Sequence, residues 1–468
     1  MTLPREILQT ENEGLFSMGR KPVDIPPAAG REKRSYYLNM GPQHPAMHGV
    51  IRLLLELEGE KVRDAEVEIG FLHRAFEKHA ETEVWNNVIP WTDRLNYVSP
   101  LINNVGYCMA VEKLCGLTVP ERGQYIRTIA CEVSRVTDHL TCVAASAMEL
   151  GAFTVFLYMM KARETLYQLV DKLTGARVTT SYTRVGGVKG DLPPGFEAEL
   201  LAAFAGVRGI LREVDGLLTK NRIFYDRVNK TGVISAADAL AYGITGPFLR
   251  STGVPYDVRR AQPYLVYDRV DFEVPVGTRG DNLDRYLVRM AEMEQSMRIV
   301  EQCFQQMPAG KHSLEEAELI EANVMADEGK RGNIGKIWDR TAKVAVNLEG
   351  QARSAHGDVL AQEPRFDLPP KEETYGSIEG LMRHFEIIMW GRGIRPPAGE
   401  AYAAVEGGNG ELGFHIYSDG SDRAYRVRCR PPCLFIMAAL PKMLIGGNIA
   451  DIIATFGSVN MIAGELDR

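Results

Sequence analysis

The sequence reads ERGQYIRTIACEVSRVTDHLTCVAASAM at residues 121–148, and this stretch decides the fold class. Its apolar residues recur at spacings of three and four, which is the period of one face of an α-helix. They are Tyr125, Ile129, Val133, Val136, Leu140, Val143 and Ala147. A long helix with one apolar face must bury that face against other elements, so the stretch predicts a mainly helical body.

The same helical period continues on the C-terminal side of this stretch. A second helix is expected at 152–173, because Gly175 follows it as a C-terminal glycine would. A third helix is expected at 196–218. Asp281 can cap a long fourth helix. The apolar stripe of that helix consists of Leu283, Leu287, Met290, Met293, Met297, Val300 and Phe304.

Short strands are expected at both ends of this helical body, where polar and apolar residues alternate. The N-terminal strands are expected at 35–40, 50–58 and 62–69. A C-terminal β-meander is expected around turns at 407–410 and 418–421, with short helices beside it at 378–390, 434–444 and 448–456. The fold class is therefore α+β, mainly α, with small antiparallel β-sheets.

Changes in this pattern divide the chain into five expected segments. These are an N-terminal extension at 1–33, an antiparallel β-sheet with a histidine loop at 34–70, a helical core at 71–307, a charged insertion at 308–375, and a C-terminal helix, β-meander and tail at 376–468.

The composition is that of an ordinary globular chain of 468 residues, with 45% hydrophobic and 25% charged residues. The net charge of −7 gives no electrostatic support to a role in nucleic-acid binding. The N-terminal residues are acidic and lack the apolar segment of a signal peptide. We therefore expect a bacterial protein made in the cytosol.

The most apolar stretch, residues 141–160, is interrupted by Glu149 and Gly151. A charge near the middle of a membrane span is expensive, so a pair of buried helices explains this stretch better. Glu149 then becomes a candidate for a functional site, because an apolar setting disfavours the charged form of a carboxyl group.

The cysteines give no sign of a metal centre. None of them form a Cys-x-x-Cys pair, and a scattered set in a cytosolic chain is typical of buried apolar thiols. They are Cys108, Cys115, Cys131, Cys142, Cys303, Cys429 and Cys433. The chain is therefore expected to bind no metal and to hold no iron–sulfur cluster by itself.

Two histidines lie in the loop GPQHPAMHG at residues 41–49. Its two prolines and two glycines keep the segment out of regular structure and make it stiff. The loop therefore presents the imidazoles of His44 and His48 on a rigid support. Two other interpretations stay open: a turn whose histidines bind backbone groups, or half of a metal site without its remaining ligands.

Other polar residues in apolar or constrained settings are candidates for a site, and each has a structural alternative. His73 and Arg74 could form a helix-surface charge pair with Glu77. Asp93 and Arg94 could be a buried structural pair. The remaining candidates are Tyr97, which could be half-buried packing, His139, which could be a satisfied core histidine, and Glu149. Spacing alone does not assign a reaction to them.

Several motifs occur in an order that is specific to one family. They are GPQHPAMHGV at 41–50, GFLHRAFEK at 70–78, TDRLNYVS at 92–99, VGTRGD at 276–281 and GELDR at 464–468. From about Ser35 to the C-terminus, apart from 311–375, the chain closely resembles the D-subunit family of proton-pumping NADH:quinone oxidoreductases, respiratory complex I. That family is similar in fold to the large subunit of nickel–iron hydrogenases.

The resemblance to hydrogenases raises a competing function. A hydrogenase nickel site needs thiolates from a cysteine pair near each end of the chain. Here no cysteine precedes Cys108 and none follows Cys433. The nickel site cannot be built, and the resemblance implies that quinone occupies the corresponding cavity.

The resemblance also implies roles for individual residues. His48 and Tyr97 match the residues that hydrogen-bond the two quinone carbonyls, with His44 in the same quinone-binding loop. Glu149 matches an acidic residue beside that histidine, where the family more usually has Asp. Arg74 matches an arginine near the iron–sulfur cluster of the neighbouring subunit. The family often has a histidine where this chain has Thr179, which favours a low-potential quinone such as menaquinone.

The implied partners are those of the complex. Electrons would come from the terminal iron–sulfur cluster of the adjacent B subunit. Further contacts would be to the C subunit, to other subunits of the peripheral arm and to the H subunit of the membrane arm. The chain would lie peripherally on the cytoplasmic face of the bacterial inner membrane. It would bind and protonate quinone while the complex translocates protons.

Two rival functions remain from the sequence. One is a hydrogenase-like scaffold that only assembles its neighbours and has no need of His48 or Tyr97. The other is a related quinone reductase that takes electrons from ferredoxin or F420, which depends on subunits outside this sequence.

Overall fold

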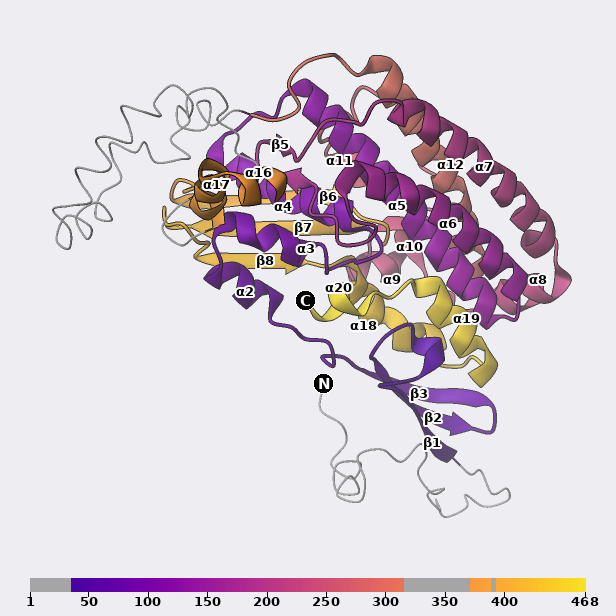
Figure 1. The fold of residues 1–468 in the computed structure, drawn as a ribbon. Coiled ribbons are helices and arrows are strands. Elements are labelled where there is room, and N and C mark those ends of the chain that lie inside the picture. Colours follow the sequence, from indigo (N-terminus) through magenta and orange to yellow (C-terminus); the bar gives the residue numbers. More distant parts are fainter. Residues whose placement is uncertain (1–34, 315–370, 389–392) are drawn as a thin grey trace, which may run out of the picture.

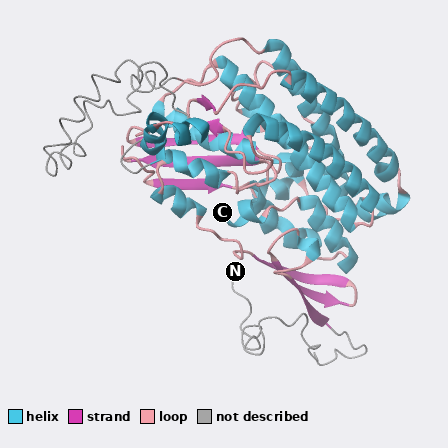
Figure 2. Ribbon diagram, in the orientation of Figure 1, coloured by secondary structure: helices cyan, strands magenta, loops and turns pink. Residues whose placement is uncertain are grey.

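The computed structural model describes residues 35–314, 371–388 and 393–468 (Figures 1 and 2). Helices form the body of this part, and its strands form three small sheets in which every pairing is antiparallel. The expected fold class is confirmed. The extension expected at 1–33, and most of the insertion expected at 308–375, lie outside the described residues.

Four long helices pack side by side in the body: α5 (Glu121–Glu149), α6 (Phe153–Thr174), α7 (Phe196–Val214) and α12 (Asn282–Gln306) (Figure 1). They form because most residues of their apolar stripes are buried. In the stripe expected for α12, Leu287 is an exception, because it is 40% exposed. The helix expected at 196–218 ends four residues early, because the chain continues as a π-helical turn, η3 (Asp215–Thr219). The split between α5 and α6 confirms the expected helix pair at 141–160.

Shorter helices and a two-residue β-ladder complete the body. They are α2 (Phe76–Thr82), η2 (Trp85–Val88), α3 (Ile89–Thr92), α4 (Pro100–Cys115), β4 (Thr183–Arg184), β5 (Gly187–Val188), α8 (Arg222–Val228), α9 (Ala236–Ala241), α10 (Gly246–Arg250) and α11 (Val258–Ala261). None of the helices in the described ranges combines the length and the hydropathy of a bilayer-spanning segment.

The N-terminal sheet has the order β1–β2–β3, from β1 (Ser35–Met40), β2 (Arg52–Glu58) and β3 (Lys61–Glu68). Alternate residues of β2, namely Leu53, Leu55 and Leu57, are buried. Figure 1 shows this sheet at the edge of the molecule beside the C-terminal helices. The histidine loop connects β1 to β2, so the sheet holds the loop against those helices.

The C-terminal sheet is the expected meander of β6 (Gly399–Glu406), β7 (Glu411–Ser418) and β8 (Arg426–Arg430), preceded by α16 (Lys371–Gly376) and α17 (Ile378–Ile388). Helix α4 packs against β6 and β7. A Cβ atom at Gly106 would lie 3.0 Å from Val405 and 3.1 Å from Phe414, so glycine allows this close approach.

The chain ends with α18 (Pro432–Leu444), α19 (Ile449–Val459) and α20 (Ala463–Asp467). The last residues are therefore a buried helix and not the expected tail. The Asp467 carboxylate accepts hydrogen bonds from the backbone amides of Gly70 and Leu72, which fixes this end to the chain that follows β3. Local sequence patterns do not indicate this contact, because it spans nearly the whole chain.

Two apolar cores result. The larger one lies among the long helices and the C-terminal sheet, and the smaller one lies between the N-terminal sheet, the histidine loop and α18–α20. Met47 of the loop belongs to the smaller core, and Tyr97 packs against it. The candidate residues His48 and Tyr97 thus border the same core from two different segments of the chain.

The cap expected at Asp281 is present at the start of α12. Its buried carboxylate accepts from Asp284 N and Lys230 N, both at 2.9 Å. Asp281→Ala leaves both amides unpaired, so we expect a loss of about 2 kcal/mol in the stability of the start of α12. Hydrogen exchange of that segment in the purified complex measures it. Asp281→Asn keeps one acceptor and should lose about half as much; equal exchange in all three proteins would contradict the assignment.

Candidate functional site

The histidine loop is built around a short 3₁₀ turn, η1 (Pro45–Met47). His44 precedes this turn, and its Nδ1 accepts from Ala46 N at 3.3 Å. His48 follows it in a left-handed conformation with φ of 49°. A Cβ atom at Gly41 would collide with the Ile51 carbonyl oxygen at 1.9 Å, so only glycine fits there. His44 therefore binds its own loop, while His48 points away from it.

His48 is paired with Glu149, the last residue of α5. Its Nε2 lies 2.7 Å from Glu149 Oε1, and the two side chains are 16% and 8% exposed. The ring also packs edge-on against Phe456 of α19. A carboxylate oxygen only accepts, so this Nε2 carries the proton when Glu149 is ionised. His48 and Glu149 are thus neighbours in space, as expected, although they lie 101 residues apart in sequence.

The second oxygen of Glu149, Oε2, is buried and has no hydrogen-bond partner among the described residues. Gly457 of α19 faces it closely, since a Cβ atom there would lie 3.1 Å from this oxygen. The carboxyl group is therefore held on one side only, by His48.

Tyr97 lies on a rigid turn between α3 and α4. The neighbouring Asn96 fixes this turn: its Oδ1 accepts from Val98 N, and its carbonyl oxygen accepts from Asn103. The Tyr97 hydroxyl has no partner in the part of the chain that the structure describes. Burial raises the pKa of this hydroxyl, as does Cys433, against a smaller opposite effect of Arg74. Tyr97 is thus a protonated donor that is free to bind a ligand.

Arg74 is held near Tyr97 by backbone oxygens. Its Nη2 donates to Arg94 O at 2.6 Å and to Gly464 O at 3.1 Å. Burial lowers the pKa of Arg74, and the nearby Arg94 adds to this effect. The guanidinium contacts no carboxylate among the described residues. It donates hydrogen bonds to backbone oxygens only.

The helix-surface charge pair proposed for His73 and Arg74 with Glu77 is wrong. Glu77 faces the arginines Arg426, Arg428 and Arg468 instead. His73 Nδ1 lies 2.7 Å from the Asp467 carbonyl oxygen. The buried C-terminal helix provides these partners, and local spacing could not reveal them.

The proposed buried pair of Asp93 and Arg94 is also wrong. Asp93 accepts from the backbone amide and hydroxyl of Ser181, while the exposed Arg94 donates to Pro90 O. Burial raises the pKa of Asp93, partly offset by these hydrogen bonds. His139 is a buried core histidine with Nε2 at 2.8 Å from Glu292, as interpreted. It is not fully satisfied, because its Nδ1 is buried without a partner among the described residues.

A buried polar network that the sequence did not indicate lies beside Tyr97. Asp138 of α5 accepts from Asn96 and from Asn460. Further along, Glu465 of α20 accepts from Cys433 N at 3.0 Å, and burial raises the pKa of Glu465 to about 7. Its members come from distant segments. The motif GELDR at 464–468 was the one signal that could have found it.

The predicted residues thus form two groups on the smaller core. His48 is paired with Glu149, and Arg74 is close enough to Tyr97 to affect its pKa. His44 stays with its own loop. No group of three or more His, Cys, Asp or Glu residues within the described ranges is arranged to hold a metal ion.

Comparison with known proteins agrees with these motifs. A family model described as "Respiratory-chain NADH dehydrogenase, 49 Kd subunit" matches residues 149–468. An NADH-quinone oxidoreductase D subunit of Anaeromyxobacter sp. (strain Fw109-5) is 48% identical over 92% of this chain and 89% of its own length. The chain belongs to the D-subunit family of NADH-quinone oxidoreductases. It is therefore a component of an oxidoreductase complex.

Other members of the family show how far the likeness extends. A D subunit of Sorangium cellulosum (strain So ce56) is 48% identical over 92% of this chain and 95% of its own length. A protein of Bdellovibrio bacteriovorus named as a combined C/D subunit is 44% identical, and the match covers 68% of that longer protein. The resemblance predicted from the motifs is confirmed.

Proposed function

We propose that this chain forms the quinone site of an NADH:quinone oxidoreductase, in which His48 and Tyr97 hold the quinone headgroup. The observation that carries the proposal is the His48–Glu149 pair, whose side-chain atoms lie 2.7 Å apart. The pair borders the same apolar core as Tyr97, whose hydroxyl has no partner among the described residues. The names of the relatives include quinone as the electron acceptor of their complexes.

The chemistry suits these side chains. Reducing a quinone to a quinol takes two electrons and two protons, and negative charge develops on the two oxygens. Imidazolium and phenol groups are hydrogen-bond donors, and bonds from fixed donors strengthen as this charge develops. Glu149 holds the His48 ring in orientation and can return a proton to it. The chain's own residues thus bind, orient and protonate the headgroup.

The electrons and the remaining partners come from outside the chain. We infer that the terminal iron–sulfur cluster of the B subunit supplies electrons, with Arg74 on that side of the headgroup. The C/D protein of Bdellovibrio supports contact with the C subunit, since the two are one chain there. Contact with the H subunit of the membrane arm, peripheral attachment at the cytoplasmic face and coupling to proton translocation belong to the same proposal.

The backbone of His48 argues against a scaffold without chemistry. A left-handed conformation costs a residue with a Cβ atom roughly 1–2 kcal/mol, and it aims the His48 ring at Glu149. Strain of this kind gathers at functional sites, where it positions a side chain. Ser181 and Lys230 share this conformation, so the strain supports a positioning role of His48 only together with its contact to Glu149.

His48→Ala tests the site against the scaffold. We expect about a tenfold fall in kcat/KM for quinone, because one donor to a developing charge is lost and water replaces it in part. NADH-driven reduction of the clusters should stay normal. His415→Ala is a matched control, since His415 pairs with Glu400 at 3.4 Å on the exposed face of β7. Unchanged kinetics of an assembled His48→Ala complex would favour the scaffold.

Glu149→Gln tests the proton relay. The amide keeps the shape of Glu149 but cannot take up or release a proton near neutral pH, so we expect turnover and proton pumping to fall together by about tenfold. Glu164→Gln, which removes an exposed carboxylate of α6, serves as the control. Wild-type turnover and pumping in Glu149→Gln would rule out the relay and leave headgroup binding untouched.

The electron donor of the whole complex is a separate question. A ferredoxin- or F420-linked reductase would use the same headgroup chemistry with other input subunits. Identifying the chains that copurify with this one decides it, and the relatives' names favour NADH. Thr179, in place of a histidine, supports menaquinone as the acceptor.

A further inference from the structure

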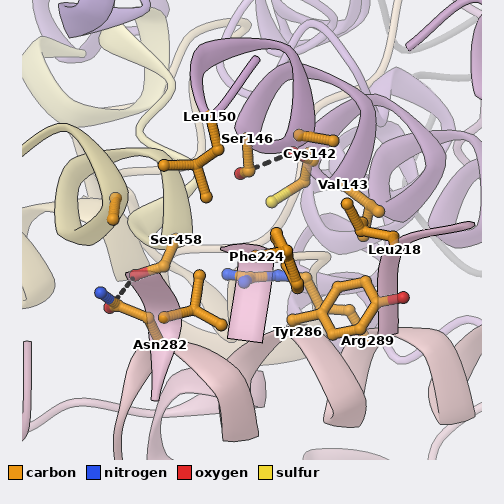
Figure 3. Close-up of a pocket in the computed structure, with 13 residues that line it drawn as sticks. Cys142, Val143, Ser146, Leu150, Leu218, Phe224, Asn282, Tyr286, Arg289 and Ser458 are labelled. Atoms are coloured by element: carbon orange, nitrogen blue, oxygen red, sulfur yellow. Dashed lines mark hydrogen bonds between the residues drawn. The ribbon is translucent and has the colours of Figure 1, made fainter. Parts of the chain in front are cut away.

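A small cavity lies between α5, α12 and α19, with α8 and η3 at its side (Figure 3). Its volume is about 20 Å³, enough for one small occupant. Most of its lining is apolar, including Val143, Ala147, Leu218, Phe224 and Val228. None of the quinone-site residues proposed above lines it, so it is a separate feature of the fold.

One charged side chain reaches into this cavity. Arg289 of α12 is 2% exposed, and its Nε is buried without a hydrogen-bond partner in the described structure. In the described ranges no carboxylate and no carbonyl oxygen bonds to its guanidinium. Figure 3 shows this group in the middle of the lining side chains. Burying an unpaired ion costs several kcal/mol, so the group requires a partner that the described part of the chain does not provide.

A second buried cation lies one turn earlier on the same helix. Arg285 donates only to neutral groups, such as Ser458 Oγ at 3.0 Å and Gly232 O at 2.5 Å. Burial lowers the pKa of Arg285 to about 9, and repulsion from Arg289 adds to this effect. Asp281 and Asp284 act on the pKa of Arg285 in the opposite direction, so Arg285 adds only part of its charge to the surroundings of Arg289.

The other polar groups of the lining already have partners. Ser146 Oγ donates to backbone oxygens, Tyr286 bonds Thr219, and Asn282 bonds Thr231. They leave the Arg289 donors without an acceptor among the described residues. The lining therefore leaves room for one small hydrogen-bond acceptor, and a negative one would also compensate the charge of Arg289.

We propose that this cavity binds one small monovalent anion, such as chloride, through the guanidinium of Arg289. Arg285 adds a second positive charge without direct contact being required. A volume of about 20 Å³ excludes phosphate, nucleotides and side chains of other proteins. The cavity shares no lining residue with the proposed quinone site, although Ala147 and Leu150 of its lining flank Glu149 in sequence.

Hydrogen exchange of the purified complex tests this site. The exchange of α12 is compared in sodium chloride and in sodium gluconate of equal ionic strength, since gluconate is too large to enter. When the anion concentration is about ten times its Kd, binding lowers the population of the locally opened state about tenfold. We expect that slowing in the wild type. Equal exchange in the two salts would mean that water alone fills the cavity and would overturn the proposal.

Variants of the same helix sharpen the result. Arg289→Met should remove the difference between the salts, whereas Arg289→Lys should keep most of it. Arg298→Met, at an exposed position of α12, should behave as the wild type. A chloride effect that persists in Arg289→Met would contradict the site. If Arg289→Met does not assemble, crystals of the wild-type complex in bromide decide: an anomalous peak at Arg289 supports the site, and its absence overturns it.

Discussion

Tyr97→Phe should lower quinone reduction by the assembled complex about a hundredfold. The exchange removes one oxygen atom and keeps the ring, so the packing of Tyr97 against the smaller core stays intact. The hydroxyl has no other partner in the described structure, and its raised pKa keeps it protonated. On the role proposed for Tyr97, its removal deletes a donor to a developing negative charge, and losing one such donor costs about 10²–10³ in kcat.

The measurement compares NADH:quinone turnover with reduction of the iron–sulfur clusters by NADH. We expect turnover to fall while the clusters still become reduced, because electrons still arrive but the quinone has lost one of its two proposed donors. Tyr425→Phe is a matched control, since Tyr425 is 73% exposed between β7 and β8. Normal quinone turnover in an assembled Tyr97→Phe complex would refute the role of Tyr97 while leaving family membership unaffected.

Features of the fold that depend on local periodicity could be predicted from the sequence. The stripe of α5, the Asp281 cap of α12 and the turns of the C-terminal meander all follow from residues within a few positions of each other. The end of α7 could not be predicted, because the apolar pattern continues through Leu218 while the backbone changes to a π-helical turn. Periodicity reports which face is buried and not which hydrogen-bond ladder is used.

Contacts of the candidate site between distant residues could be predicted only where the family resemblance indicated them. His48 and Glu149 were associated through the family resemblance, and the structure places them at hydrogen-bond distance. The sequence patterns gave Asp93 and Glu77 partners close in sequence. In the structure Asp93 bonds Ser181 and Glu77 faces Arg468, both of which lie far away in sequence. A charged side chain takes whichever opposite group the tertiary fold brings near, and no local spacing carries that information.

The buried charges inside the body are the clearest case. Glu132 of α5 is fully buried between Arg135, at 3.2 Å, and Arg259, at 3.1 Å, and Tyr267 donates to it at 2.6 Å. In the sequence Arg135 lies three residues after Glu132, at the spacing of a helical ion pair. Arg259 and Tyr267 lie 127 and 135 residues away, and no local pattern indicates them. The two arginines outweigh the effect of burial and lower the pKa of Glu132 to about 2.

Glu132→Ala should therefore destabilise the chain by about 3–5 kcal/mol, because two buried guanidinium groups lose their shared carboxylate. Glu199→Ala should cost no more than about 1 kcal/mol, since Glu199 pairs with Lys172 where both side chains are more than 40% exposed. Pulse proteolysis of the purified complex in urea, with the intact fraction of this chain as the signal, measures the stability loss of both variants. Similar urea midpoints for the two variants would contradict a structural role of the buried cluster.

Acid gives an independent check on the same group. A carboxyl group whose pKa is lowered on folding contributes its stability above the ordinary pKa of 4.5, and that contribution is lost as the pH falls toward 2. The difference in urea midpoint between the wild type and Glu132→Ala should therefore be largest near neutral pH and shrink below about pH 4.5. A difference that stays constant down to about pH 3 would show that Glu132 stabilises the body by packing and not by charge.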